Sequence, residues 1–130
     1  MLKYIKVNES NKDLAIEMQA EIFTHERSPK QIEQGIKTGN PINYIVYNDQ
    51  KPVGIVGYYK DANYPEHLFI NWFGVVQSER RKGFGKSIMQ WLIGQCTNEP
   101  AKYLTTYTEK IENYASVKMY ESLGFKIRDY

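Results

Sequence analysis

The sequence predicts a mixed α/β fold of the α+β kind with a mainly antiparallel sheet, and three observations lead to this prediction. Strand-like runs alternate with amphipathic helical stretches along the whole chain. Two such runs, 42–48 and 52–60, are joined by a short polar turn, which indicates an antiparallel hairpin. The second half continues with a strand, a helix and a further strand, the order of a β-α-β unit.

The first half of the chain is expected to contain one strand and then two helices. The strand is predicted at 2–7. The first helix is predicted at 13–23, where Leu14, Met18 and Ile22 recur every four residues, as on one buried face.

The second helix has a clear beginning and end in the sequence. Ser28 suits the N-cap, and Pro29 suits the first helical position. The run Gly39-Asn40-Pro41 should end the helix, because glycine and proline break helical structure.

The second half of the chain is expected to hold a long central strand at 66–76. This stretch is mostly apolar, which is typical of a strand buried on both faces. Gly74 lies within it and indicates a bulge or a close approach of another part of the chain. The remaining elements are predicted at 83–96 (helix), 102–108 (strand), 113–124 (helix) and 125–130 (strand).

Composition limits the class of protein. We expect residues 1–130 to form a single domain, and the net charge of +2 argues against a nucleic-acid binder. Without a signal-peptide segment or a stretch that could span a bilayer, a cytoplasmic location with no membrane partner is expected. The single cysteine, Cys96, excludes an internal disulfide and cysteine-rich zinc motifs, and no metal is expected.

The stretch "SERRKGFGKS" joins the central strand to the next helix. Strand, glycine-rich loop and helix together form an anion site from backbone N–H groups at a helix N-terminus. Arg80, Arg81, Lys82 and Lys86 concentrate positive charge there. Taken by itself, the loop is also consistent with a solvated basic turn.

Two nucleotide-binding motifs are disfavoured by single positions. A P-loop needs a glycine where this chain has Arg80, and the dinucleotide fingerprint needs one at Ile88. The remaining pattern, Arg80-x-x-Gly83-x-Gly85, suits a pyrophosphate that carries a long extended arm.

This pattern, after an apolar strand, resembles motif A of the GNAT family of N-acetyltransferases. Farther along, "NYASVKMYESLGF" resembles motif B of the family through Asn113, Tyr120 and Gly124-Phe125. The order of elements is similar to the family over essentially the whole chain. The resemblance implies a sheet whose fourth and fifth strands splay apart, with helices on both faces.

The resemblance implies an N-acetyltransferase that transfers the acetyl group of acetyl-CoA to a primary amine by direct attack in a ternary complex. The loop would hold the pyrophosphate, and the central strand would hold the pantetheine arm. The implied coenzyme contacts are Phe73, Val75, Arg80, Arg81, Lys82, Gly83, Phe84, Gly85, Lys86 and Asn113.

The resemblance also implies Tyr120 as the general acid that protonates the departing thiolate. The general base is left open, because Phe69 stands where the family often has Glu or His. His67 and Asn71, the second acting through a water, share the face of Phe69 by strand alternation and are both candidates. Glu66 is a third candidate, although it should face the other way.

A non-catalytic acyl-CoA-binding or sensing module is the alternative from another class. Phe69 at the expected base position favours it. Such a module would keep the coenzyme site and lack the base. Independently of this choice, the residues alone also allow Asn113 to be only an N-cap and Tyr120 only a packed aromatic residue. Measured turnover distinguishes the two classes.

Two further expectations concern partners. Tyr58, Tyr59, Tyr64, Glu26 and Glu66 could form an aromatic and acidic mouth for a cationic amine. Family members usually have a further strand after the Gly-Phe strand, and for this sequence we expect that strand to be absent, supplied by a partner, or replaced by an open edge. An open sheet edge can pair with another chain, so a homodimer is one expectation.

Overall fold

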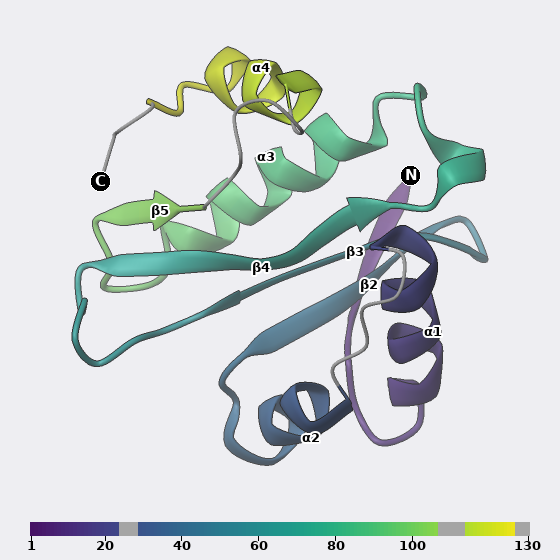
Figure 1. Cartoon of the computed structure of the whole chain (residues 1–130), viewed down its shortest axis with the longest axis horizontal. Coiled ribbons are helices and arrows are strands. Elements are labelled where there is room, and N and C mark those ends of the chain that lie inside the picture. The colour runs from purple at the N-terminus through teal and green to yellow at the C-terminus, as the bar shows by residue number, and fades with distance from the viewer. Residues whose placement is uncertain (24–28, 107–113, 127–130) are drawn as a thin grey trace.

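The computed structural model describes residues 1–23, 29–106 and 114–126. Its strands form one sheet in the order β1-β2-β3-β4-β5 (Figure 1). The strands are β1 (Leu2–Lys6), β2 (Ile42–Asn48), β3 (Lys51–Tyr59), β4 (His67–Val75) and β5 (Tyr103–Thr105). The helices are α1 (Lys12–Ile22), α2 (Pro29–Thr38), the 3-10 helix η1 (Gln77–Glu79), α3 (Phe84–Cys96) and α4 (Tyr114–Ser122).

The sheet is mixed, as the sequence predicts. β1, β2, β3 and β4 pair antiparallel in that order, and β5 joins β4 in parallel. The β2–β3 hairpin turns at Asp49, whose φ of 56° is the left-handed value that such tight turns need. The parallel pair follows from the α3 crossover between β4 and β5.

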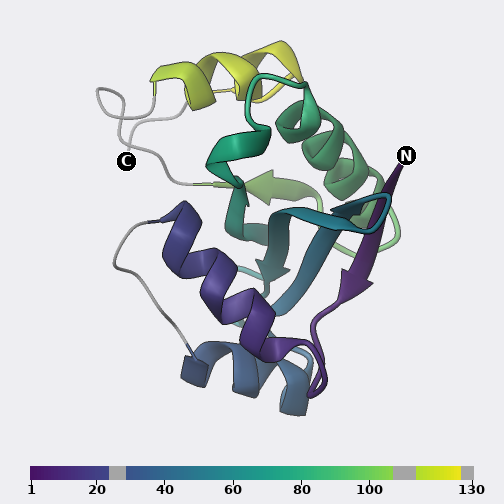
Figure 2. The same ribbon diagram turned by 90° about the vertical axis from the view of Figure 1, so that its right-hand side faces the viewer.

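Helices cover both faces of the sheet. Figures 1 and 2 show α1 and α2 on one side, and α3 and α4 on the other. Each side has its own apolar core, and alternation along β3 divides the residues between them: Ile55 packs with α1 and α2, and Val56 packs with α3. The predicted arrangement of helices on both faces is therefore confirmed.

The buried face of α1 differs from the predicted stripe. Ala15, Met18 and Gln19 are buried, whereas Leu14 is 37% exposed. A helix has 3.6 residues per turn, so a strict four-residue spacing drifts away from the contact line. Met18 and Ile22 do pack on the sheet side, and Leu14 lies at the margin.

Several predicted ends fall outside the described residues. Of the expected final strand 125–130, Phe125 and Lys126 are described and are not in a strand. Ser28, proposed as a helix cap, also lies outside the described ranges. The open edge and the homodimer stay predictions.

Two features are absent from the described ranges. No helix there combines the length and the apolar character that crossing a membrane requires. The same ranges contain no group of three or more His, Cys, Asp or Glu side chains placed to hold a metal ion.

Candidate active site

The site is built on the second half of β4. β5 pairs with β4 at three positions in the described residues, from His67 to Phe69. Beyond Phe69, β4 runs on to Val75, and no β5 residue in the described part of the chain pairs with it there. Within the described ranges the two strands therefore separate after Phe69, and this edge of β4 faces a gap.

A β-bulge interrupts β4 at the start of this gap. Gly57 of β3 pairs with Asn71, but Ile55 pairs with Gly74, so β4 contains one additional residue. Trp72, inside the bulge, has a φ of 42°, a left-handed conformation that few residues other than glycine adopt.

Glycine is required at position 74 because the end of α1 lies too close for a larger side chain. A Cβ at this position would lie 2.4 Å from Cγ2 of Ile22 and 3.3 Å from Cζ of Phe23. The end of α1 therefore packs directly on the backbone of β4. The sequence indicated a bulge or a close approach at Gly74, and the structure has both, with the bulge centred one or two residues earlier.

The backbone of Val75 is directed into the gap. Val76 donates its N–H to the carbonyl of Val53 in β3 (2.9 Å). Successive residues of a strand point their N–H groups to opposite edges, so the N–H of Val75 faces the gap. The Val75 carbonyl accepts a hydrogen bond from Nε of Arg80 (3.0 Å). An extended ligand arm could pair with this edge as an added strand.

The glycine-rich loop ends as the N-cap of α3. Gly83 takes a φ of 82° at the cap, and no side chain caps the helix there. The first intrahelical bond runs from the N–H of Ser87 to the carbonyl of Gly83 (3.2 Å). The N–H groups of Phe84, Gly85 and Lys86 thus have no acceptor within the helix, which makes this end suitable for an anion.

Glu79 places a carboxylate at the start of the loop. Its side chain is 7% exposed and lies 3.1 Å from Nζ of Lys82 and 3.5 Å from Nζ of Lys51. The hydrogen bond from Lys82, together with the charge of Lys51, lowers the pKa of Glu79 below its ordinary value. Lys82 is thereby engaged by Glu79, while Arg80 and Arg81 line the neighbouring cleft.

A cleft of about 740 Å³ joins the open edge of β4, the loop and α4. Its lining includes these predicted coenzyme contacts: Phe73, Val75, Arg80, Arg81, Gly83, Phe84 and Gly85. Lys82 and Lys86 are not part of the lining. Asn113 lies outside the described residues.

Tyr120 enters the cleft from α4. Its ring centroid is 6.3 Å from that of Phe73 on β4. Burial raises the pKa of the Tyr120 phenol above its ordinary value, and a hydrogen bond with the side chain of Thr106 acts in the opposite direction. The phenol therefore holds its proton at neutral pH and could give it to a leaving group in the cleft.

The site combines a glycine-rich helix N-terminus with a bulged strand, and comparison with known protein families agrees with it. Residues 8–125 match the model of the acetyltransferase (GNAT) family. The chain belongs to this family. No functionally curated protein matches the sequence.

Solved acetyltransferases share the fold of this GNAT chain. The aminoglycoside N-acetyltransferase AAC(6')-Iy, bound to a bisubstrate analogue, has a TM-score of 0.83 at 16% identity, covering 100% of this chain and 94% of that one. The ribosomal-protein-S18-alanine N-acetyltransferase of Escherichia coli has a TM-score of 0.83 at 16% identity, covering 99% and 80%. Arabidopsis thaliana NAA60 has a TM-score of 0.79 at 13% identity, covering 98% and 86%. At these identities the likeness shows the fold.

Two of the candidate bases of this acetyltransferase do not line the cleft. Nδ1 of His67 lies 2.8 Å from Oγ1 of Thr105. Asn71 donates from Nδ2 to Oδ1 of Asn43 (2.9 Å), and Gly57 leaves room for that contact across β3. A role for His67 or Asn71 as base stays a prediction, and it requires the acceptor nitrogen to approach from outside this cleft.

The predicted aromatic and acidic mouth is also not brought to the cleft. Tyr58, Tyr59, Tyr64 and Glu66 are not part of its lining. Tyr58 is buried on the α3 side, and Glu26 lies outside the described residues.

Sequence reasoning missed seven of the described residues that line the cleft: Ile22, Phe23, Ile70, Trp72, Glu79, Thr106 and Met119. One of them had a usable signal, since Thr106 directly follows β5, where the splayed pair opens. Ile22 and Phe23 look like any helix end, and Trp72 looks like an ordinary strand residue.

Cys96 takes no part in the site. It lies at the end of α3, and burial, aided by the negative charge of Glu99, raises the pKa of its thiol to about 11. A thiol that keeps its proton is a poor nucleophile. Cys96 also does not line the cleft.

Proposed function

We propose that this GNAT protein transfers the acetyl group of acetyl-CoA to a primary amine by direct attack in a ternary complex. The observation that carries the proposal is the single cleft that joins the open edge of β4, the free N–H groups of α3 and the phenol of Tyr120. An anion site, an edge for an extended arm and a proton donor are the parts that this chemistry needs.

The size and charge of the cleft support acetyl-CoA as cosubstrate. A volume of about 740 Å³ falls in the range of ordinary ligand sites. Arg80 and Arg81 would lie beside the pyrophosphate, and the N–H groups at the start of α3 would bind its oxygens. The pantetheine arm would lie along Phe73 and Val75.

The reaction follows from these positions. The neutral amine attacks the thioester carbonyl carbon, and a backbone N–H at the bulge stabilises the negative oxygen that forms. The carbon–sulfur bond then breaks, and Tyr120 gives its proton to the thiolate. The acylated nitrogen releases its surplus proton to water, and a proton from solvent restores the phenol.

The fold neighbours support this assignment in part. AAC(6')-Iy has been solved with CoA and with an analogue that joins CoA to an acetylneamine, and NAA60 with a bisubstrate analogue. These proteins hold coenzyme and acceptor together, which is what a ternary-complex mechanism requires. Their acceptors differ from one another and do not carry over to this chain.

One observation favours the alternative, an acyl-CoA-binding module without turnover. Neither His67 nor Asn71 lines the cleft, so the candidate bases stand apart from the proposed acid. An acceptor that is neutral at the working pH needs no base, and measured turnover separates the two functions.

The first experiment is thermal unfolding with acetyl-CoA, CoA and ATP in parallel, followed by an assay for free CoA thiol with a panel of amines. Ligand at 100 times its Kd should stabilise the protein by about 2.7 kcal/mol, a shift of several degrees. We expect acetyl-CoA to stabilise the protein, ATP not to stabilise it, and release of CoA thiol to depend on an added amine. Stabilisation without release from any amine would favour the binding module, and no stabilisation by acetyl-CoA would contradict both.

A further inference from the structure

The cleft is apolar where it meets the end of α1. Ile22 and Phe23 reach it from the end of α1, and Trp72 reaches it from the bulge in β4. All three side chains are half-buried, so each presents part of its surface to the cleft. In the rest of this subsection these three residues are called the apolar end.

The apolar end lies directly against the strand that would carry the acetyl group. A Cβ on Gly74 would come 2.4 Å from Ile22 and 3.3 Å from Phe23. Gly74 stands between Phe73 and Val75, the proposed positions of the pantetheine arm. A substituent next to the attacking nitrogen would therefore meet these side chains first.

Trp72 is held firmly in this position. Its indole N–H donates a hydrogen bond to Oε1 of Gln31 on α2. Its ring packs edge-on against Phe23, with centroids 5.1 Å apart. The left-handed backbone of the bulge sets the direction of the side chain. The indole is thus fixed by α1, α2 and β4 together.

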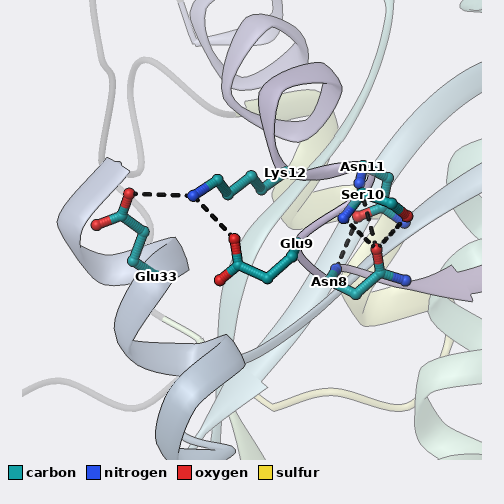
Figure 3. Close-up of polar contacts among 6 residues, drawn as sticks. All are labelled: Asn8, Glu9, Ser10, Asn11, Lys12 and Glu33. Carbon is teal, nitrogen blue, oxygen red and sulfur yellow. Dashed lines mark hydrogen bonds and ion pairs between the residues drawn. The ribbon is translucent and has the colours of Figure 1, made fainter.

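The N-terminal end of α1, far from Phe23, is linked to α2 by an ion pair. Nζ of Lys12 lies 3.0 Å from Glu9 and 3.4 Å from Glu33 (Figure 3). Exposed ion pairs of this kind contribute little stability. Met18 of α1 and Ile32 of α2 are both buried in the same apolar core, and this shared burial holds the two helices more strongly. Together they give the apolar end a rigid support.

The charged residues of the cleft come from a different segment, the glycine-rich loop. Among the described lining residues, the charged ones are Glu79, Arg80 and Arg81, all in or beside the loop. The carboxylate of Glu79 is already paired with Lys51 and Lys82. A polycationic acceptor would find no free carboxylate in the described lining, whereas an apolar group would find three side chains.

From this juxtaposition we propose that the acceptor is an apolar monoamine, a primary amine joined through one or two carbons to an aromatic or branched aliphatic group. Ile22, Phe23 and Trp72 determine this specificity. The inference rests on the proposed acetyltransferase function and names the substrate class for the same site. Burial of a phenyl-sized group is worth about 10-fold or more in kcat/KM.

The test compares three acceptors with the full chain and acetyl-CoA: 2-phenylethylamine, ethanolamine and spermidine. Release of CoA thiol is measured at one pH for all three. We expect kcat/KM for 2-phenylethylamine to exceed that for each of the others by about 10-fold or more. A higher kcat/KM for ethanolamine or spermidine would overturn the proposal.

A variant locates the preference in the structure. Phe23→Ala should reduce the ratio of kcat/KM for 2-phenylethylamine over ethanolamine to near one, and Phe23→Leu should restore most of it. Leu14→Ala is the matched control, since Leu14 lies on the same helix outside the cleft and is 37% exposed. An unchanged ratio in Phe23→Ala would contradict the assignment of these residues.

Measurements on the wild-type protein distinguish failure of the proposed acceptor class from failure of the proposed acetyltransferase function. If acetyl-CoA raises the Tm and some amine releases thiol, only the acceptor class is at stake. If acetyl-CoA neither stabilises the protein nor releases thiol with any amine, the proposed function fails and the acceptor class fails with it.

Discussion

The two ends of the cleft are built in opposite ways. The loop end comes from consecutive residues, from Arg80 to Lys86, and offers mainly backbone N–H groups. The apolar end brings together Ile22 and Phe23 with Trp72, about fifty positions apart in the chain, and offers side chains. A site made of backbone depends on conformation, while a site made of side chains depends on packing.

This difference predicts which substitutions should affect coenzyme binding and which should affect the choice of acceptor. At the loop end, a substitution that changes φ or moves the free N–H groups should weaken coenzyme binding. The loss of a single cationic side chain should weaken that binding less. At the apolar end, a change of side-chain volume should alter the acceptor and leave the coenzyme bound. The predictions below test this contrast, and Tyr120, which lies between the two ends, comes first.

Tyr120→Phe should have the largest effect. Removing the proposed proton donor should lower kcat by about 100-fold or more. The Kd for CoA should stay the same, because the ring remains in place against Phe73. Tyr103→Phe is the control, since Tyr103 is 49% exposed on β5 and outside the cleft. An unchanged kcat in Tyr120→Phe would remove Tyr120 from the mechanism.

The pH profile of the wild type gives a second view of Tyr120. Burial raises its pKa, so the phenol stays protonated past its ordinary value of about 10. The rate should therefore show no loss from this group below about pH 10, and should fall as the pH rises further. The residual rate of Tyr120→Phe should lack that fall. A loss that begins near neutrality in the wild type and is absent in Tyr120→Phe would contradict the raised pKa.

Gly74→Ala should disturb the apolar end through α1. The new methyl group would meet Ile22 at 2.4 Å, and such overpacking costs about 1–3 kcal/mol of unfolding free energy. Combining it with Ile22→Ala should give a loss smaller than the sum of the two single losses. Denaturant unfolding measures both. As control, Gly94→Ala, with no atom within 4 Å of its new methyl, should stabilise α3.

Gly83→Ala should act on the loop end through the backbone. Its φ of 82° is costly for alanine, about 1–2 kcal/mol, although no atom lies near the new methyl. The Kd for CoA should also rise, because the N–H groups of α3 would shift. Gly39→Ala matches it with a φ of 80° and open space, but lies far along the chain from the loop. We expect the two variants to lose equal stability, and only Gly83→Ala to raise the Kd for CoA. The same Kd for CoA in both variants would refute the loop as the anion site.

Arg81→Gly should give the smallest effect. Glycine relieves the left-handed strain at φ 67°, but also increases the freedom of the unfolded chain, so the net stability change should be under about 1 kcal/mol. CoA should bind somewhat more weakly, with a weaker dependence on salt, because one cation is lost. Asp49→Gly, at φ 56° in the β2–β3 turn, should match the stability change and leave CoA binding unaltered. A large loss of stability in Arg81→Gly would mean that the side chain has a structural role.

Much of the fold could be predicted from the sequence because its determinants are local. Alternation, the Pro29 and Gly39 boundaries of α2 and the polar turn at Asp49 each act within a few residues. The face of α1 was placed less well, since Leu14 and Ala15 differ in burial through the angle at which the helix meets the sheet. No local pattern records that angle.

The splay of β4 from β5 was implied only by the resemblance to the GNAT family. The sequence by itself determined the glycine-rich loop, the irregularity of the central strand near Gly74 and the position of Tyr120 two turns into the last helix. These features depend on backbone conformation, which residue type and spacing specify directly. Only the tertiary structure decided that Phe23 and Trp72 meet, that Asn71 turns towards Asn43, and that Glu79 engages Lys51. Such contacts join residues that are far apart in the chain, and they exist only after the strands have paired and the helices have packed on the sheet.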